Sequence, residues 1–471
     1  CQSSQSAMAL VRAAGHVPFS FSFSFSVFFL LFCVCGHNAF FSSSCVSAAR
    51  APSVLPSALI RATHIGNDGD DVMSSSSSSK EVGKKAPPPS AHGHRLLPQY
   101  EIDLDLPPSQ RYEPLFQDTA TNLNATVWQF YRQYFEHDAV LLDVLYEISK
   151  KRGPENEEQQ QEVDGLVERS RLPREFVQAV QMIYELQTLM VPVINGTKHH
   201  KQVDVIPEEY AALKRIPWRG PGCTGIVAMC ADGNVYHARN LDFSPLDIMK
   251  NLVYVAVFTR GGKEVFRSQM AAGYTSVITA YKAGADGFTV ERNTRFTDHL
   301  GGNEQTIQHL ISGRPLNGWS LRKIAETHNS FDDVVKTISD TPYCSPEYNI
   351  LSGVGKGKVL SKDPDRVAHV QTLGHPGVGE NKRGDYVIMT NFDFYWGDIR
   401  EYFDPTAGGV GKKTRREAAE ANLARWPVGK LTPDALFETI NAPYVLAKDT
   451  VFQMLTSVSA NSWNASQPIL Q

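Results

Sequence analysis

The sequence has few cysteines beyond its first fifty residues, no excess of either charge and no internal repeat. Four of its seven cysteines fall between Cys1 and Cys45, which leaves Cys223, Cys230 and Cys344. These three cannot form a disulfide framework, and a single bridge from Cys230 to Cys344 would leave Cys223 free. With 46 basic and 50 acidic residues, the chain lacks the basic surface that binds nucleic acid, so we predict no nucleic-acid partner.

The N-terminus has the pattern of a secretory leader. Arg12 precedes the apolar run Val27–Cys35, and small residues follow at Val46–Ala49. We predict a signal peptide over residues 1–49. The alternative is a retained membrane anchor, for which the strictly apolar run is short. Three glycosylation sequons fit a route through the secretory lumen, at Asn124, Asn195 and Asn464.

The next residues divide into a linker and a largely helical region. Residues 50–97 contain a serine run and three consecutive prolines, so we predict a disordered linker. Order is expected to begin with the alternating strand 101–106. One helix is predicted from an Asn124 cap and a second from Pro173, with a charged loop at 150–162 between them.

Residues 195–222 are polar and rich in glycine and proline, which predicts an exposed loop. From Cys223 onward the chain is rich in strand signals, interrupted by helical stretches over 305–341 and from about Lys413. This order predicts an α+β fold in which stacked sheets are covered by helices. We therefore expect an N-terminal domain over 98–222 and a β-rich domain over 223–471.

The segment that begins at Cys223 forms a predicted hairpin. If Asp232-Gly233 is a two-residue turn, Cys223 lies directly opposite Asp242, within side-chain reach. In the same register Arg239 points to the opposite face, so a bulge near residues 240–241 is needed to bring it to the thiol.

A thiol is a weak nucleophile until it loses its proton, so Cys223 needs a base. His237 is the nearest imidazole in the sequence. A second solution is cleavage of the bond between Gly222 and Cys223, which would give Cys223 a free α-amine with an ordinary pKa of about 7.7–8.0. That amine lies within reach of its own thiol and can act as the base.

Several motifs together resemble one family. They are Cys223-Thr-Gly-Ile-Val, Asp232-Gly, His237-Ala-Arg-Asn-Leu-Asp-Phe243, Asn293-Thr-Arg-Phe296, Thr390-Asn-Phe-Asp393, Arg415-Arg416, the strand before Pro107-Pro108 and Tyr184-Glu185. Taken in their order along the chain, over about residues 100–425, they resemble the acid ceramidase and N-acylethanolamine acid amidase family of N-terminal-nucleophile hydrolases, in the choloylglycine hydrolase-like superfamily. The resemblance implies a four-layer αββα sandwich with a mainly helical N-terminal subunit packed against it.

The resemblance also implies roles for single residues. Cys223 would be the cleavage residue and the nucleophile, Asp242 would hold its α-amine, and Arg239 would orient the thiol. Asn391 would donate to the oxyanion, and Arg416 would support the same region, with Arg415 as the neighbouring candidate. The chain departs from the family pattern at Gly225, where serine is usual, at Ala238, where glycine is usual, and in the insertion over 195–222.

The implied activity is hydrolysis of a lipid N-acyl amide without a metal or cofactor, by two cleaved chains that stay associated as a heterodimer. Ceramide is the favoured substrate because of the strand before Pro107-Pro108, and an N-acylethanolamine is the alternative because of Asp340-Thr-Pro342. Other acyl amides, such as conjugated bile acids or penicillin-like amides, stay open. So does an uncleaved lumenal lipid-binding protein. We expect an acidic secretory-pathway compartment, foremost the lysosome, with secretion as the alternative and contact with a membrane surface.

Overall fold

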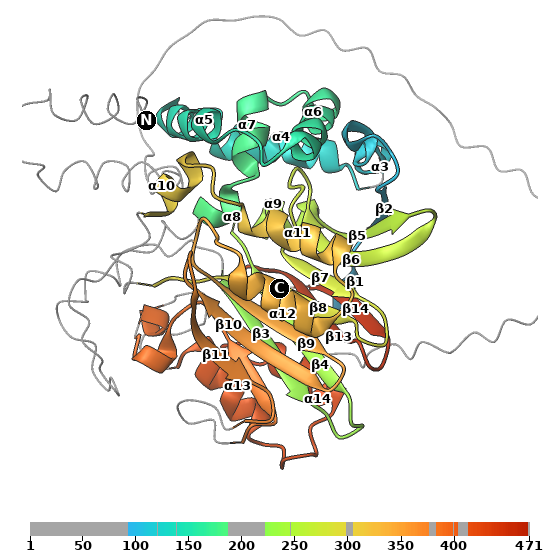
Figure 1. The fold of residues 1–471 in the computed structure, drawn as a ribbon, viewed down its shortest axis with the longest axis vertical. Coiled ribbons are helices and arrows are strands. Elements are labelled where there is room, and N and C mark those ends of the chain that lie inside the picture. The colour runs from blue at the N-terminus through green and yellow to red at the C-terminus, as the bar shows by residue number, and fades with distance from the viewer. Residues whose placement is uncertain are drawn as a thin grey trace, which may run out of the picture. The chain divides into compact units, whose positions relative to one another are not determined.

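The computed structural model describes residues 93–119, 121–137, 139–186, 222–244, 246–297, 305–375, 383–398, 400–403 and 413–469. The predicted signal peptide and most of the predicted linker lie outside these residues. So do the Asn195 sequon and nearly all of the predicted insertion. Within the described residues, two β-sheets lie face to face and helices cover their outer faces (Figure 1).

The first sheet has six antiparallel strands and contains the nucleophile hairpin. Its order is β1 (His94–Leu96), β14 (Ser462–Pro468), β13 (Thr450–Ser457), β4 (Val235–Asp242), β3 (Gly222–Met229) and β12 (Tyr386–Met389). The hairpin of β3 and β4 therefore lies inside the sheet, between β12 and β13. Every residue of β4 is buried, because the second sheet covers one face and helices cover the other.

The second sheet has eight strands and packs against the first through β8 and β9. Its order is β11 (Val367–Thr372), β10 (Lys356–Lys362), β9 (Glu347–Gly353), β8 (Phe288–Thr294), β7 (Thr279–Lys282), β6 (Lys263–Ala271), β5 (Val253–Arg260) and β2 (Gln99–Asp103). All neighbours are antiparallel except β2, which runs parallel to β5.

Helices form the two outer layers. On the eight-stranded sheet lie α11 (Asn317–Thr327) and α12 (Phe331–Asp340), and on the six-stranded sheet lie α13 (Arg415–Leu423) and α14 (Pro433–Ile440). Shorter elements are α9 (Leu246–Leu252), α10 (Gln305–Ile311) and the 3₁₀ turns η1 (Pro108–Gln110), η4 (Phe394–Trp396) and η5 (Arg400–Phe403). This arrangement confirms the predicted α+β, four-layer αββα sandwich.

The N-terminal helices are drawn in blue, teal and green in Figure 1. They are α3 (Glu113–Gln117), α4 (Leu123–Tyr134), α5 (Ala139–Arg152), α6 (Glu157–Ser170), α7 (Arg174–Val180) and α8 (Ile183–Leu186). The prediction of a charged loop over 150–162 is wrong, because α5 ends at Arg152 and α6 begins at Glu157. Asn156 accepts the amide of Gln159 and caps α6, whose first turn carries two acidic residues at its positive end. Helix α4 begins at Leu123, so Asn124 lies inside it and does not cap it.

The N-terminal segment contributes one strand to each sheet. β1 pairs with β14 in one sheet, and β2 pairs with β5 in the other. Cleavage before Cys223 would leave each of these strands bonded to a strand of the C-terminal segment. β1 also places regular structure inside the range that we predicted as linker.

Two smaller expectations concern single side chains. Cys230 and Cys344 are free and lie in separate hydrophobic clusters, so the bridge that the sequence allowed does not form. The sequon residues Asn124 in α4 and Asn464 in β14 are both half-buried.

Among the described residues, no helix combines the length and the apolar character needed to cross a bilayer.

Candidate active site

The hairpin register decides which side chains meet. The Cys230 amide donates to the Asn234 carbonyl, so the turn that joins β3 and β4 has three residues, Ala231–Gly233, and Gly233 takes a positive φ of 79°. Cys223 is therefore paired with Leu241, and Gly222 with Asp242. The two-residue turn and the pairing of Cys223 with Asp242 were wrong by one position.

This shift brings Arg239 to the thiol without a bulge. Paired residues share a face, and so do residues two apart along a strand, so Cys223, Leu241 and Arg239 all point between the sheets. The Arg239 Nη2 lies 3.7 Å from the Cys223 Sγ and donates to the Arg292 carbonyl at 3.0 Å. Nη1 donates to the Ile278 carbonyl at 2.9 Å, so the buried guanidinium is fixed in one orientation.

Asp242 lies on the other face, beside the backbone of Gly222. Its Oδ2 accepts from Arg415 Nη1 at 3.1 Å, and its Oδ1 accepts from the Thr450 hydroxyl at 2.6 Å. A Cβ at Gly222 would lie 2.8 Å from Oδ2, which is closer than side chains tolerate. Residue 222 must therefore be glycine for the Asp242 carboxylate to lie this close to the backbone before Cys223.

Asn391 contacts the nitrogen of Cys223. Its Oδ1 accepts the Cys223 amide at 2.8 Å and Arg415 Nη2 at 2.8 Å, whereas its Nδ2 donates to the Thr294 carbonyl at 2.8 Å. The predicted role was donation to an oxyanion. In the uncleaved chain the Asn391 Oδ1 instead accepts the backbone N–H of Cys223, and this nitrogen belongs to the bond that would be cut.

Arg415, rather than Arg416, reaches this group. Arg415 Nη1 donates to the Cys223 carbonyl at 2.7 Å, while Arg416 pairs with Glu420 at 2.7 Å and lies 4.2 Å above the Phe394 ring. The two arginines open helix α13 after a capping box at Thr414, and neighbouring helical residues point in different directions. The structure therefore corrects the choice of Arg416.

The Cys223 thiol is fully buried, and this burial raises its pKa. Burial raises the pKa of Cys223, the nearby Arg239 and Tyr184 act to lower it, and Glu291 and Asp242 act to raise it. The Tyr184 hydroxyl, from α8, lies 3.5 Å from Sγ and donates to the Arg292 carbonyl at 2.9 Å. A group that removes the thiol proton is therefore required for attack at neutral or acidic pH.

His237 does not contact the thiol. Its Nε2 lies 2.8 Å from a Glu291 oxygen and its Nδ1 lies 2.7 Å from the Thr289 hydroxyl, in the layer between the sheets. Sequence reasoning missed Glu291 and Thr450 as neighbours of the site. Tyr184 carried a signal through its place in the family motif, but Thr450 lies in a tail without any motif.

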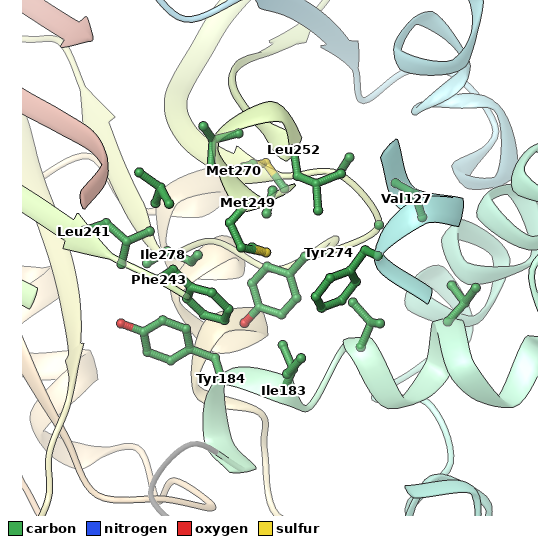
Figure 2. Close-up of a pocket in the computed structure, with 18 of the residues that line it drawn as sticks. Val127, Ile183, Tyr184, Leu241, Phe243, Met249, Leu252, Met270, Tyr274 and Ile278 are labelled. Atoms are coloured by element: carbon green, nitrogen blue, oxygen red, sulfur yellow. The ribbon is translucent and has the colours of Figure 1, made fainter. Parts of the chain in front are cut away.

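An apolar pocket lies between the hairpin residue Leu241 and the helical residues Val127 and Ile183 (Figure 2). Its lining includes Tyr184, whose hydroxyl lies 3.5 Å from the Cys223 Sγ, and Leu241, the cross-strand partner of Cys223, together with Phe452. The remaining walls come from both segments, Val127, Phe130, Leu172, Phe176, Val177, Val180 and Ile183 from the first and Phe243, Met249, Leu252, Val253, Met270, Ala271, Ala272, Gly273, Tyr274, Ile278 and Val451 from the second. Such a lining suits an apolar group of a ligand.

A four-layer sandwich with a cysteine at the head of an inner strand defines an N-terminal-nucleophile type of fold. A family profile described as the beta subunit of N-acylethanolamine-hydrolyzing acid amidase matches residues 96–142. Acid ceramidase of Heterocephalus glaber is 24% identical over 404 residues, covering 81% of this chain and 89% of that protein. Acid ceramidase of Homo sapiens is 24% identical and covers 80% of this chain and 87% of that protein.

N-acylethanolamine-hydrolyzing acid amidase of Caenorhabditis elegans is 27% identical over 303 residues, covering 64% of this chain and 76% of that protein. A solved structure of the Caenorhabditis elegans ortholog of this amidase shares 22% identity and a TM-score of 0.43, covering 52% of this chain and all of that one. The sequence matches confirm the resemblance: over most of its length the chain is similar to acid ceramidases and to an N-acylethanolamine-hydrolyzing acid amidase.

Proposed function

We propose that the chain is an amidase that cleaves its own backbone between Gly222 and Cys223 and then uses Cys223 to hydrolyse the N-acyl amide of a lipid. One observation carries this proposal. The thiol, the nitrogen and the carbonyl oxygen of Cys223 are each contacted by a different side chain, Arg239, Asn391 and Arg415. A buried structural cysteine needs none of these contacts.

Self-cleavage begins with attack of the Cys223 sulfur on the Gly222 carbonyl carbon. The bond between that carbon and the Cys223 nitrogen breaks, the nitrogen takes the thiol proton, and a thioester forms. Water then hydrolyses the thioester, which releases the Gly222 carboxylate and restores the thiol. The new α-amine remains beside the Asn391 Oδ1, which already accepts its N–H, and close to the carboxylate of Asp242.

The same atoms then serve the lipid amide. The α-amine takes the thiol proton, the thiolate attacks the acyl carbonyl, and the protonated amine gives its proton to the leaving nitrogen. The acyl group is held on sulfur as a thioester until water frees the fatty acid. Arg239 favours the thiolate, and the apolar pocket would hold the acyl chain.

Ceramide is the substrate we propose, because acid ceramidases align with about four-fifths of the chain. N-acylethanolamine is the second candidate, supported by the amidase of Caenorhabditis elegans and by the family profile. Hydrolysis of an equimolar mixture of the two lipids, followed by mass spectrometry of the released amines, separates them. Preferential release of ethanolamine would reverse the order we propose.

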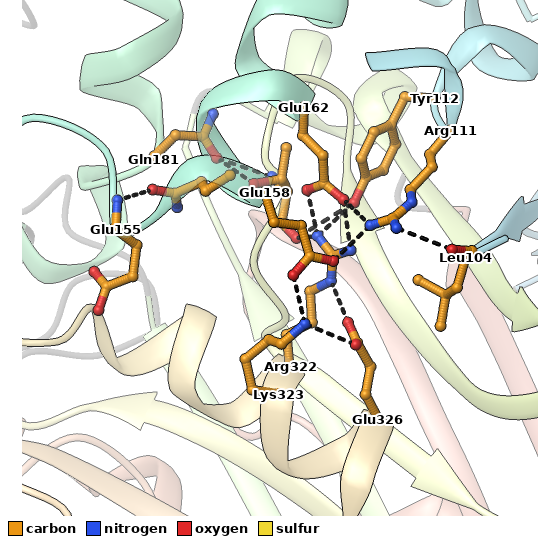
Figure 3. A network of polar contacts seen from close by, with 12 residues as sticks. Leu104, Arg111, Tyr112, Glu155, Glu158, Glu162, Gln181, Arg322, Lys323 and Glu326 are labelled. Carbon is orange, nitrogen blue, oxygen red and sulfur yellow. Dashed lines mark hydrogen bonds and ion pairs between the residues drawn. The ribbon is translucent and has the colours of Figure 1, made fainter. Parts of the chain in front are cut away.

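We propose that the two chains remain associated in the lysosome or another acidic compartment. Besides β1 and β2, a buried ionic network joins the segments (Figure 3). Arg322 of α11 donates to Glu162 of α6 at 2.6 Å, and Lys323 donates to Glu158 at 2.7 Å. Membrane contact, through the helical region that also lines the pocket, is part of the same proposal.

The deciding experiment is intact-mass and N-terminal analysis of the wild type and of Cys223→Ala after incubation at acidic and neutral pH. A new chain that begins at Cys223, formed only by the wild type, is the expected result. A wild-type chain that stays intact at every pH and hydrolyses neither lipid would contradict the proposal and favour a lipid-binding protein.

A further inference from the structure

Glu291 of β8 occupies the space that Gly225 of β3 leaves empty. A Cβ built at Gly225 would lie 2.7 Å from both carboxylate oxygens, which no real side chain tolerates. The glycine at 225 is one of the departures from the family pattern, in which serine is usual. In this chain the glycine and the carboxylate therefore depend on each other.

The carboxylate lies between two basic groups of β4. Its Oε2 is 2.8 Å from the His237 Nε2, and its Oε1 is 3.6 Å from the Arg239 Nε. All three side chains are fully buried. The distance to Arg239 is that of an ion pair, and the Arg239 Nε makes no hydrogen bond with any other described residue. Glu291 is thus the negative group that faces this guanidinium.

The far side of His237 is also fixed. Its Nδ1 lies 2.7 Å from the Thr289 hydroxyl, which lies 2.6 Å from the Ser352 hydroxyl. These bonds hold the imidazole, and the imidazole in turn holds one oxygen of Glu291. The other oxygen is left to face Arg239. A side chain that only filled space above a glycine would not need this support from β8 and β9.

We propose that Glu291 is a positioning residue for the nucleophile: it fixes the Arg239 guanidinium beside Cys223 and offsets its positive charge. This inference rests on the proposed function, because it takes the Cys223 thiol as the reacting group. Glu291 acts through Arg239, whose Nη2 faces the sulfur from the opposite end of the same guanidinium.

The electrostatic consequence has a definite sign. The charged and titratable groups that surround the thiol are Arg239 and Asp242 of β4, Tyr184 of α8 and Glu291 of β8, with His237 behind Glu291. Burial raises the pKa of Cys223, Arg239 lowers it, and Glu291 raises it. Removing the charge of Glu291 leaves Arg239 uncompensated, so the thiol should ionise at lower pH.

The test is the pH dependence of Cys223 alkylation by iodoacetamide in the purified full-length chain, followed by peptide mass analysis. Cleaved and uncleaved chains are separated by mass and compared within each class. In Glu291→Gln the profile should move by about one pH unit toward acid, or about tenfold faster labelling at a fixed pH. Glu291→Asp, which keeps the charge, should return the profile close to that of the wild type.

Two internal controls and one matched variant exclude a merely structural effect. Cys230 and Cys344 are also buried and free, so their labelling reports general loosening of the fold. Glu347→Gln removes a buried carboxylate that faces Arg292 from the neighbouring strand, and it should leave the Cys223 profile in place.

A Glu291→Gln profile that superimposes on the wild type would overturn the inference, and so would equal acceleration at all three cysteines. The mutual dependence of Gly225 and Glu291 is tested separately by thermal unfolding. Gly225→Ala should lower the melting temperature, and Glu291→Ala in the same chain should restore part of the loss. If the wild type neither cleaves itself nor hydrolyses lipid amides, but its profile still shifts in Glu291→Gln, the proposed function fails and the inference on Glu291 stands.

Discussion

The two faces of the β3–β4 hairpin hold side chains with different parts in the proposed reaction. The face between the sheets carries the Cys223 thiol and Arg239, and Glu291 reaches it from β8. The face toward α13 carries Asp242, and Arg415 approaches from that helix. One face therefore controls the ionisation of the sulfur, and the other holds the backbone of the bond that would be cut.

This separation has a physical reason. A strand presents successive side chains to opposite faces, so a residue can offer its side chain to one layer while its peptide groups contact another. Cys223 uses both, since its sulfur meets Arg239 and its carbonyl meets Arg415. Variants on the two faces should consequently fail in different ways, which the following predictions exploit.

The largest effect is expected on the helix side, where two adjacent arginines form a natural control. Arg415→Ala removes the donor to the Cys223 carbonyl and to Asp242, so self-cleavage should slow by about a thousandfold. Arg416→Ala removes the pairs with Glu420 and Glu417 and the contact with Phe394, none of which involves Cys223, and it should stay within about threefold of the wild type. Time courses of chain splitting by intact mass measure both. Equal loss in the two variants would refute the assignment of Arg415.

A smaller loss is expected for Asp242→Asn, which keeps the shape but removes the charge beside Gly222. The α-amine of the cleaved enzyme would lose the anion that orients it, so lipid amide turnover should fall by about a hundredfold. Thr450→Ala removes the hydrogen bond to the Asp242 Oδ1 and two to the backbone of Ala447 but leaves the charge of Asp242, so it should cost less than Asp242→Asn. Turnover is to be measured on fully cleaved protein. Unchanged turnover in Asp242→Asn would remove this residue from the mechanism.

On the face between the sheets, Tyr184→Phe should have a milder effect. It deletes a hydroxyl 3.5 Å from the sulfur but leaves Arg239 in place. The hydroxyl also donates to the Arg292 carbonyl, but only its contact with the sulfur involves the reacting atom. Loss of one such hydrogen bond costs about 1 kcal/mol, so self-cleavage should slow about threefold to tenfold. The Cys223 alkylation profile should move slightly toward alkaline pH, because this hydroxyl acts to lower the pKa of the thiol. A loss as large as that of Arg415→Ala would mean that the hydroxyl has a chemical role beyond a contact.

Sequence alone was enough for the layers and for most of the nucleophile hairpin. Alternating strand signals after Cys223, helical stretches between them and the family motifs predicted the sandwich and placed Arg239, Asp242 and Asn391 near the thiol. These features depend on short stretches of sequence or on family motifs, so they can be predicted from the sequence. The Asp-Gly signal also located the turn correctly within a few residues.

The remaining details depend on geometry that a pattern does not carry. One extra residue in the loop at Gly233 changed every cross-strand pair, which moved Asp242 away from the thiol side chain and Arg239 toward it. The choice between Arg415 and Arg416 depends on the start of a helix, at the Thr414 cap. Thr450 reaches Asp242 from a strand more than two hundred residues away, in a tail that carried no motif.

The smallest effect is expected at the contact between the two segments. Burial acts to raise the pKa of Glu158, but hydrogen bonds from Lys323 and Arg111 outweigh it and lower the pKa to about 2 from the usual 4.5. Because the folded-state pKa lies below the unfolded one, the stabilisation is complete above pH 4.5 and is lost as the pH falls toward 2. The network thus stays charged in an acidic compartment.

Glu158→Gln should therefore lower the melting temperature by about 1–3 °C at pH 5–7, with a difference that vanishes near pH 2. The effect is small because the Glu158 side chain is 26% exposed and solvent screens its pairs. Glu168→Gln on the same helix is the matched control, since that side chain is 63% exposed and its nearest cation lies 4.0 Å away. Thermal unfolding of the three proteins across this pH range measures the effect. A difference for Glu158→Gln that is constant with pH would show that its charge does not contribute to holding the N-terminal helices on α11.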